Sequence, residues 1–308
     1  MTAHLHDDEI PIDLALVRAL VDRAFPQYAD EELRPLGASG SSNALFRLGD
    51  ELLVRLPRQP GGTTSIEKEA RWLPVVGPRL PVPVPKVVAV GEPDLGYPER
   101  WSVTTWLEGL PPTVVTGAAD GDRRALAADL AEVVSRLREL EVPGRAAEDP
   151  SLRWYRGQPL HEHDADFRET VDACRRIPDL DLDLDAVTRV WDAAVAAPAP
   201  VQEPRWFHGD LCAENLLVRD GRLGGVLDFG GLAVGDPTVD LMLAWEVLDA
   251  AGRDTFRHAL AVEDGAWLRG KGWAVFLTTM TFPYYRHTMP ARCADRLAMA
   301  RAVLAEAD

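Results

Sequence analysis

The sequence predicts an α+β fold with two lobes, a small β-rich N-terminal lobe over residues 1–107 and a larger, mainly helical C-terminal lobe over residues 108–308. Three observations predict it. Short aliphatic and β-branched runs separated by turn signals fill much of the chain from residue 36 to residue 107. Apolar residues recur at helical spacing through much of the chain after residue 120. A β-hairpin signal interrupts these helices between residues 215 and 228.

The small lobe should begin with a helix over residues 12–29, because its apolar residues fall on one side at helical spacing. A turn rich in Gly and Ser follows at residues 36–43. Thr64 or Ser65 can cap a second helix. The elements predicted after the turn are strands at 44–48, 52–56, 86–90 and 101–107, and the helix at 64–73.

The large lobe should open with a helix over residues 122–141, where Leu126, Leu130 and Leu137 recur at helical spacing. Residues 148–185 are acidic and irregular at first, and then helical. His161 and His163 lie in this segment, but no further partner at metal-ligand spacing follows them. A solvated loop or an acidic segment that faces the substrate is therefore favoured over a metal site.

Two apolar runs joined by the turn signal Asp220-Gly221 form the predicted hairpin. Asn215 stands directly before this hairpin, and Asp228 stands directly after it. A hairpin returns the chain to the end at which it started. We therefore expect the Asn215 and Asp228 side chains to meet, although they are far apart in sequence.

The residues around the hairpin fit one kind of chemistry. Transfer of a phosphoryl group from ATP to an alcohol needs a carboxylate that orients the hydroxyl and accepts its proton, and an amide and a second carboxylate that hold magnesium. Asp210, in the run His208-Gly209-Asp210, is the catalytic candidate, and Asn215 and Asp228 are the candidate metal ligands. A lone Asp-Phe-Gly after a hairpin would mean little, but this combination is rare.

This run resembles the aminoglycoside phosphotransferase family, the small-molecule branch of the protein-kinase-like fold. That family has His-Gly-Asp where most protein kinases have His-Arg-Asp, and it has a trailing element like Gly235-Asp236-Pro237. The resemblance extends from about residue 36 to about residue 290 and is strongest over residues 206–245. It implies a two-lobed protein-kinase-like fold, ATP (with GTP possible) and Mg²⁺ as cofactors, and a small-molecule acceptor.

Arg55 falls where the resembling family usually has the lysine that grips phosphate, which is a departure. Arginine keeps the positive charge and can bind phosphate bidentately, but its geometry differs from that of lysine. Glu69 borders the inward stripe of the helix at 64–73, so helical phase favours it over Glu67 as the partner of Arg55. A surface Arg and a surface Glu are the alternative.

The turn at residues 36–43 contains Ser39 and Gly40, which would let backbone N–H groups approach phosphate. Taken alone, this turn indicates only a hairpin. The resemblance implies that the backbone near Trp106 and Leu107 hydrogen-bonds adenine.

Two further residues should support the catalytic loop. Asp240 could reach back to the loop backbone, and His208 most simply has a structural role in the loop rather than that of a base. The chain from Asp228 to Pro237 is too short for the long activation segment of a protein kinase. We therefore expect a constitutively competent enzyme without a protein-docking platform.

Composition narrows the partners. The formal charge is −16 and the pI about 4.9, which argues against nucleic acid and anionic membranes and suits a cationic acceptor. Carboxylates crowd residues 161–185, where Asp164 is a candidate acceptor contact. The resemblance implies that the acidic segment and the C-terminal helices wall the acceptor cleft, which makes Glu246 and Asp249 further candidates. Acidity as a plain solubility device is the alternative.

The chain has no run of eighteen apolar residues, and its N-terminus lacks the pattern of a signal peptide. Its three cysteines are too few for a disulfide framework, and Cys212 is best explained as a packed side chain. A cytoplasmic enzyme, monomeric or dimeric, fits these features.

The sequence therefore predicts an ATP-dependent O-phosphotransferase that acts on a small cationic molecule, in the first place an aminoglycoside, as antibiotic-resistance kinases do. A macrolide phosphotransferase or a kinase of choline, homoserine or methylthioribose type is the alternative. A nucleotide-binding pseudokinase is a more distant alternative. Such a protein would be marked by loss of Asp210, Asn215 or Asp228, and all three residues are present.

Overall fold

The structure is a computed structural model, and it describes residues 8–37, 42–112, 120–198 and 203–306. The chain divides into two compact units. The N-terminal unit consists of residues Met1–Gly109 and Gly225–Gly230, and the C-terminal unit of residues Leu110–Gly224 and Gly231–Asp308. The boundary expected near residue 107 lies close to the end of the first stretch, but the sequence did not indicate that residues 225–230 return to the N-terminal unit.

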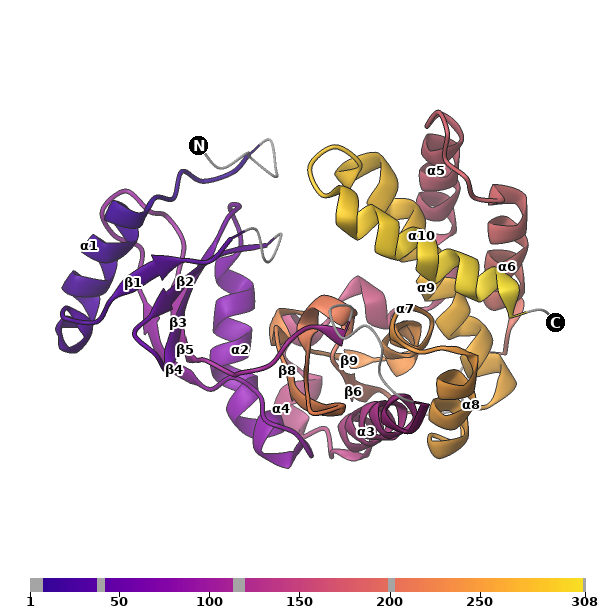
Figure 1. Cartoon of the computed structure of the whole chain (residues 1–308), viewed down its shortest axis with the longest axis horizontal. Coiled ribbons are helices and arrows are strands. Elements are labelled where there is room, and N and C mark those ends of the chain that lie inside the picture. The colour runs from indigo at the N-terminus through magenta and orange to yellow at the C-terminus, as the bar shows by residue number, and fades with distance from the viewer. Residues whose placement is uncertain (1–7, 38–41, 113–119, 199–202, 307–308) are drawn as a thin grey trace. The chain divides into compact units, whose positions relative to one another are not determined.

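The N-terminal unit is built on a five-stranded antiparallel sheet in the order β1-β2-β3-β5-β4 (Figure 1). Its strands are β1 (Leu33–Pro35), β2 (Asn43–Leu48), β3 (Leu52–Pro57), β4 (Val87–Gly91) and β5 (Trp101–Thr105). In β2 the buried residues alternate with half-buried ones, as expected for a strand with one face against a core.

Two helices flank this sheet. Helix α1 (Leu14–Ala24) packs Val17 and Leu20 against the buried residues of β2, β3 and β5. It ends earlier than the predicted 12–29 because Pro26 cannot continue it, and a 3₁₀ turn (Pro26–Tyr28) follows. Helix α2 (Thr63–Val76) contacts β4 and β5.

The predicted cap of α2 was wrong. Its N-cap is Gly62, which has no capping side chain, and neither Thr64 nor Ser65 caps it. The carboxylate of Glu99, from the segment before β5, instead accepts the backbone N–H groups of Gly61 at 2.9 Å and Thr63 at 2.8 Å. A carboxylate is favoured at this helix end because the backbone N–H groups there carry a partial positive charge.

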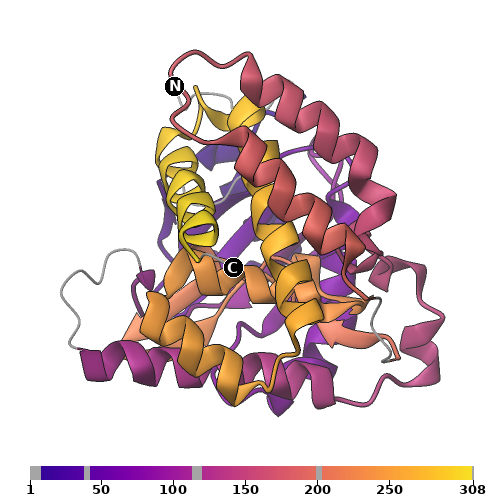
Figure 2. The same ribbon diagram turned by 90° about the vertical axis from the view of Figure 1, so that its right-hand side faces the viewer.

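The C-terminal unit is mainly helical, and α9 contacts α5, α6 and α10 in it (Figures 1 and 2). Residues on every side of α9 are buried, as expected for a helix enclosed by others. The helices are α3 (Asp120–Glu139), α4 (Gly144–Ala147), α5 (Asp164–Arg175), α6 (Leu184–Ala196), α7 (Leu243–Val247), α8 (Ala250–Ala259), α9 (Asp264–Tyr285) and α10 (Pro290–Ala305). In the described ranges, no helix has both the length and the apolar character needed to cross a bilayer.

Short strands carry the loops of interest. β6 (Arg205–Phe207) pairs antiparallel with β9 (Ala233–Gly235), and β7 (Leu216–Arg219) pairs with β8 (Arg222–Val226). The turn between β7 and β8 has φ of 51° at Asp220 and 73° at Gly221. Positive φ at both central residues is the signature of a type I′ hairpin turn, so the predicted hairpin is confirmed.

Candidate functional site

The loop that carries Asp210 follows β6 and begins with His208 and Gly209. Gly209 has φ of 84°, a region that side chains other than glycine rarely adopt. A Cβ atom there would lie 2.4 Å from the Trp154 ring and 2.6 Å from the Gly231 carbonyl oxygen. Both the backbone angle and the packing therefore require glycine, which is why this loop reads His-Gly-Asp and could not read His-Arg-Asp.

Asp240 holds this loop from a 3₁₀ segment (Pro237–Met242). Its carboxylate accepts the backbone N–H of His208 at 2.7 Å and that of Gly209 at 2.8 Å, which is the contact predicted from the sequence. The pKa of Asp240 is raised by burial, although these hydrogen bonds and His208 favour its charged form. His208 is itself buried, and its Nδ1 accepts the backbone N–H of Asp210 at 3.2 Å.

Asp210 is 38% exposed and is oriented by two side chains. Arg156 Nη1 donates to Asp210 Oδ1 at 2.6 Å. Asn215 Nδ2 donates to the Asp210 backbone carbonyl at 2.8 Å and lies 3.3 Å from Oδ2. Burial favours the neutral acid, but the Arg156 guanidinium lowers the pKa of Asp210 below its usual value. The ion pair with Arg156 therefore keeps the Asp210 carboxylate ionised and oriented, so that it can accept a proton.

Sequence reasoning missed Arg156. The residue lies in the irregular segment Trp154-Tyr155-Arg156-Gly157, far from the catalytic loop in sequence. Adjacent aromatic residues and a glycine inside an otherwise acidic, loop-like stretch were the available signal, because such residues in a loop often serve a site.

The N-terminal unit carries a second cluster. Arg55 Nη1 donates to Glu69 Oε2 at 2.6 Å, so the ion pair predicted from strand and helix phase forms. Glu67, the competing candidate, pairs with Arg100 at 2.9 Å instead. Arg55 Nη2 also donates to Asp228 Oδ1 at 3.1 Å, a contact that the sequence did not indicate.

The charges of this cluster depend on one another. Burial alone would lower the pKa of the Arg55 guanidinium, but the carboxylates of Glu69 and Asp228 raise it above its usual value. Burial raises the pKa of the Glu69 carboxyl, and Arg55 acts in the opposite direction. Asp228 has φ of 56°, an uncommon backbone conformation for a residue with a side chain, as is often found where a side chain serves a site.

Each of the two predicted metal ligands has an oxygen atom that is available for a cation. Asp228 makes both of its hydrogen bonds to described residues through Oδ1, from Arg55 and from the Gly230 N–H at 3.3 Å, so Oδ2 remains available. Asn215 donates through Nδ2, so its amide oxygen also remains available. Carboxylate and amide oxygens suit Mg²⁺, which protein sites hold with few side chains plus phosphate oxygens and water. No group of three or more His, Cys, Asp or Glu in the described ranges could hold a metal by itself.

The sheet presents apolar surface beside Arg55. Leu45 lies directly opposite Arg55 in the β2–β3 pairing, and Leu53 precedes Arg55 by two positions, so the three side chains share one face. Leu45 and Leu53 are both half-buried. Ser39 and Gly40, the predicted phosphate-loop residues, lie outside the described residues.

Trp106 is more constrained than the sequence indicated. Its backbone N–H donates to the Glu51 carbonyl at 2.7 Å, so that group is not available to a nucleobase. Its ring nitrogen donates to Glu108 Oε1 at 2.6 Å, and the Arg47 guanidinium lies 3.9 Å above its ring. The expected base contacts in this segment therefore narrow to the Trp106 carbonyl and the backbone of Leu107.

The predicted acceptor contacts all have structural partners. Asp164 accepts the Trp191 ring N–H at 2.8 Å and pairs with Arg168 at 3.0 Å. Asp249 caps α8 through the Gly252 N–H at 2.8 Å. An acceptor role for Asp164 and Asp249 stays a prediction.

Glu246 lies beneath the catalytic loop. Its buried carboxylate pairs with Arg296 at 2.9 Å and accepts the Ala213 backbone N–H at 3.3 Å. Burial raises the pKa of Glu246, while Arg296 opposes that effect. These contacts give Glu246 a part in holding the loop, and its acceptor role stays a prediction.

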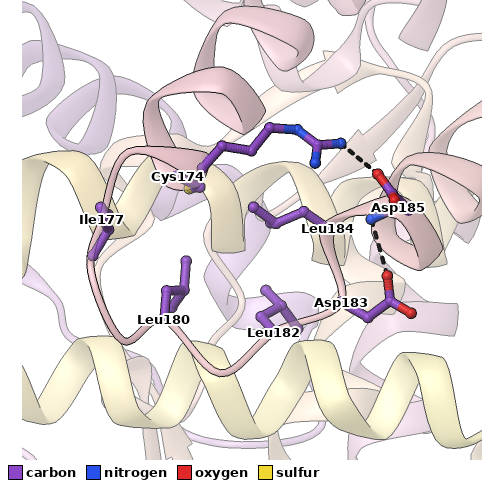
Figure 3. Close-up of a pocket in the computed structure, with 8 residues that line it drawn as sticks. Cys174, Ile177, Leu180, Leu182, Asp183, Leu184 and Asp185 are labelled. Atoms are coloured by element: carbon purple, nitrogen blue, oxygen red, sulfur yellow. Dashed lines mark hydrogen bonds and ion pairs between the residues drawn. The ribbon is translucent and has the colours of Figure 1, made fainter.

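A cavity of about 420 Å³ lies between α5 and α6 (Figure 3). Ile177, Leu180 and Leu182 line it together with the ion pair between Arg175 and Asp185. It contains none of the residues predicted for the site. His163, considered above for a metal, is buried near Tyr155, with its Nε2 3.0 Å from the Tyr155 carbonyl oxygen.

Solved structures share this fold. The GDP and kanamycin complex of APH(2")-IIia matches with a TM-score of 0.70 and 21% identity, over 96% of this chain and 98% of that one. Macrolide 2'-phosphotransferase MphH from Brachybacterium faecium matches with a TM-score of 0.62 and 23% identity, over 94% of this chain and 99% of that one. The predicted two-lobed α+β, kinase-like fold is thereby confirmed.

Sequence comparison identifies the family. An aminoglycoside 3'-phosphotransferase from Escherichia coli is 27% identical over 171 residues, which cover 54% of this chain and 59% of the relative. The match thus spans less than two thirds of that relative's length. A family model described as the phosphotransferase enzyme family matches residues 32–274, which is most of the chain. The chain therefore belongs to the phosphotransferase enzyme family.

Proposed function

We propose that this protein transfers a phosphoryl group from ATP to a hydroxyl of a small cationic molecule, in the first place an aminoglycoside. The observation that carries the proposal is the Asp210 carboxylate, which is ionised, partly exposed and oriented by Arg156 and Asn215 in a loop held by Asp240. Relatives of similar fold with bound GDP, ADP or kanamycin support a nucleotide donor and a small acceptor.

Asp210 would accept the proton of the acceptor hydroxyl while the hydroxyl oxygen bonds to the γ-phosphorus and the bond to the bridging oxygen of ADP breaks. Arg55 would contact the phosphates, and Glu69 would orient Arg55. Asn215 and Asp228 would hold Mg²⁺, which neutralises phosphate charge when it is bound.

The base would lie on the half-buried apolar surface that Leu45 and Leu53 present beside Arg55. Its polar edge would meet the Trp106 carbonyl and the backbone of Leu107, since the Trp106 N–H is already bonded. These groups suit ATP, and GTP is the second donor to be tested.

Charge supports a cationic acceptor. The chain carries a formal charge of −16. Asp166, Glu169 and Asp172 follow one exposed stripe of α5 and form no hydrogen bond or ion pair with a described residue. Such carboxylates attract a cation over a distance of about 8 Å at physiological ionic strength.

A neutral macrolide is the second candidate, and a specific observation favours it. Several acidic side chains of residues 161–185 are already paired, Asp164 with Arg168, Asp181 with Arg301 and Asp185 with Arg175. These ion pairs weaken the negative electrostatic potential that the acidic sequence of residues 161–185 predicts. Macrolide phosphotransferases are also among the structures of similar fold.

The test is ADP release with ATP or GTP, with Mg²⁺ or EDTA, against a panel of aminoglycosides, macrolides and small metabolites that includes choline, homoserine and methylthioribose. A cationic acceptor should show a KM that rises with added KCl while kcat stays nearly flat, because salt screens exposed charges. Efficient turnover of a neutral acceptor with a salt-independent KM would favour the macrolide. No Mg²⁺-dependent ADP release with any acceptor or with water would favour a pseudokinase.

A further inference from the structure

The segment Trp154-Tyr155-Arg156-Gly157 contacts the catalytic loop. Gly157 packs so closely that a Cβ atom there would lie 2.6 Å from the Phe207 ring, and its carbonyl accepts the Asp236 N–H at 3.0 Å. Trp154 lies against Gly209, where a Cβ atom would meet its ring. The segment is therefore fixed on both sides of Arg156.

The Arg156 guanidinium is held through Nε and Nη1 and by a neighbouring aromatic ring. Nε donates to the Tyr155 hydroxyl at 2.9 Å, and the guanidinium lies 4.5 Å from the Trp154 ring centre. Nη1 donates to the Gly209 carbonyl at 2.9 Å and to Asp210 Oδ1 at 2.6 Å. Arg156 is only 15% exposed, so these contacts fix its guanidinium before any substrate binds.

We propose that Arg156 is a positioning residue, which holds Asp210 Oδ1 so that Oδ2 is the oxygen presented to the acceptor hydroxyl. This inference rests on the proposed role of Asp210. Arg296 also lowers the pKa of Asp210 through its charge, whereas Arg156 both lowers this pKa and donates directly to the carboxylate at 2.6 Å. Among the residues that the structure describes, loss of Arg156 would leave the Asp210 carboxylate only the long hydrogen bond from Asn215 at 3.3 Å.

The expected effect is on turnover. A misplacement of about 1 Å in a reacting group can cost about 100-fold in rate. Arg156→Ala should therefore lower kcat by about 10–100-fold and leave the KM for ATP within about twofold, because Arg156 contacts Asp210, which faces the acceptor in the proposed reaction. Arg156→Lys should recover much of the loss, since an ammonium can still donate to Oδ1.

The experiment measures ADP release from Mg·ATP with kanamycin as the acceptor, and with water alone, for the wild type, Arg156→Ala, Arg156→Lys and Arg156→Gln. Arg153→Ala is the matched control, because Arg153 is exposed directly before this segment and its loss changes the net charge equally. Guanidinium chloride at millimolar concentration should raise kcat of Arg156→Ala and leave the wild type and Arg153→Ala unchanged. Thermal melts report whether each variant folds, and Arg156→Gln and Arg156→Lys keep the test valid if the alanine variant does not.

Two outcomes would overturn the inference. One is wild-type kcat in the folded Arg156→Ala or Arg156→Gln variant. The other is equal impairment in the alanine and lysine variants, with a raised KM for ATP and no rescue by guanidinium, which would mark a purely structural role. Asp210→Ala is measured in parallel, so that failure of the proposed role of Asp210 can be distinguished from failure of the proposed role of Arg156. If Asp210→Ala turns over normally, the proposed function of Asp210 fails, whereas an inactive Asp210→Ala beside a fully active Arg156→Ala refutes only the role of Arg156.

Discussion

Replacing Arg55 with alanine should destabilise the N-terminal unit strongly. The guanidinium donates to Glu69 Oε2 at 2.6 Å, and the Glu69 side chain is only 1% exposed. Oε1 of Glu69 is buried without a hydrogen-bond partner among the described residues, so Arg55 supplies the hydrogen bond of that carboxylate. Removing one member of a buried ion pair leaves an uncompensated charge and typically costs about 3–5 kcal/mol.

The second contact of Arg55 adds little to this loss. The Asp228 side chain is 36% exposed, so water can replace the guanidinium there. Arg55→Lys should lose less than Arg55→Ala, about 1–2 kcal/mol, because an ammonium keeps the charge beside Glu69 but lacks the planar fork that reaches both carboxylates. Adding Glu69→Gln to Arg55→Ala should recover stability, since the amide is neutral.

Urea denaturation followed by circular dichroism measures these free energies of unfolding. Arg175→Ala is the matched control, because the Arg175 and Asp185 side chains are 46% and 72% exposed and an ion pair in water contributes little to stability. In Arg55→Ala the destabilisation should shrink as pH is lowered. Burial raises the pKa of Glu69, so the folded variant binds its proton more tightly than the unfolded chain and loses stability as pH rises. A loss below about 1 kcal/mol at neutral pH would refute the reasoning.

Three further outcomes follow from the same contacts. Asp210→Ala should lower kcat by about 10²–10⁴ without changing nucleotide affinity, and near wild-type turnover would remove it from the mechanism. Asp228→Ala should weaken Mg·ATP binding, measured by calorimetry, by at least about 10–100-fold, because losing even a residue that only supports a metal ligand costs that much affinity. Glu67→Ala is the control, and its Mg·ATP affinity should equal that of the wild type. Burial raises the pKa of Cys174 to about 12 and also raises the pKa values of the other two thiols. The native protein should therefore not react with Ellman's reagent, while the denatured chain releases three equivalents, and fast labelling before unfolding would contradict this.

Local signals carried most of what the sequence predicted. The turn at Asp220-Gly221 needs only two residues that tolerate positive φ, so it could be recognised without its surroundings. Glu69 could be chosen over Glu67 as the partner of Arg55 because helical periodicity alone shows which of the two lies beside the inward face of the helix. Asp240 was predicted to reach back to the loop backbone, and its carboxylate accepts two backbone N–H groups there.

The failures share a different cause, because each depends on a contact between segments that are distant in the chain. Glu99 caps α2 from beyond β4, so the local Thr64 and Ser65 signals were misleading. Arg156 reaches Asp210 from a segment without regular periodicity. No propensity or spacing rule encodes such contacts, since they exist only once the tertiary structure has formed.

The discontinuity of the N-terminal unit limits how this protein can recombine with its relatives. A single genetic crossover near Gly109 would take Arg55 and Glu69 from one parent and Asp228 from the other, because residues Gly225–Gly230 belong to the same unit. The Val226 N–H, which donates to the Pro83 carbonyl at 3.1 Å, would also meet a foreign backbone. Chimaeras should therefore tolerate exchange of this unit only when both stretches come from the same parent, and inheritance of the whole unit requires three crossovers rather than one.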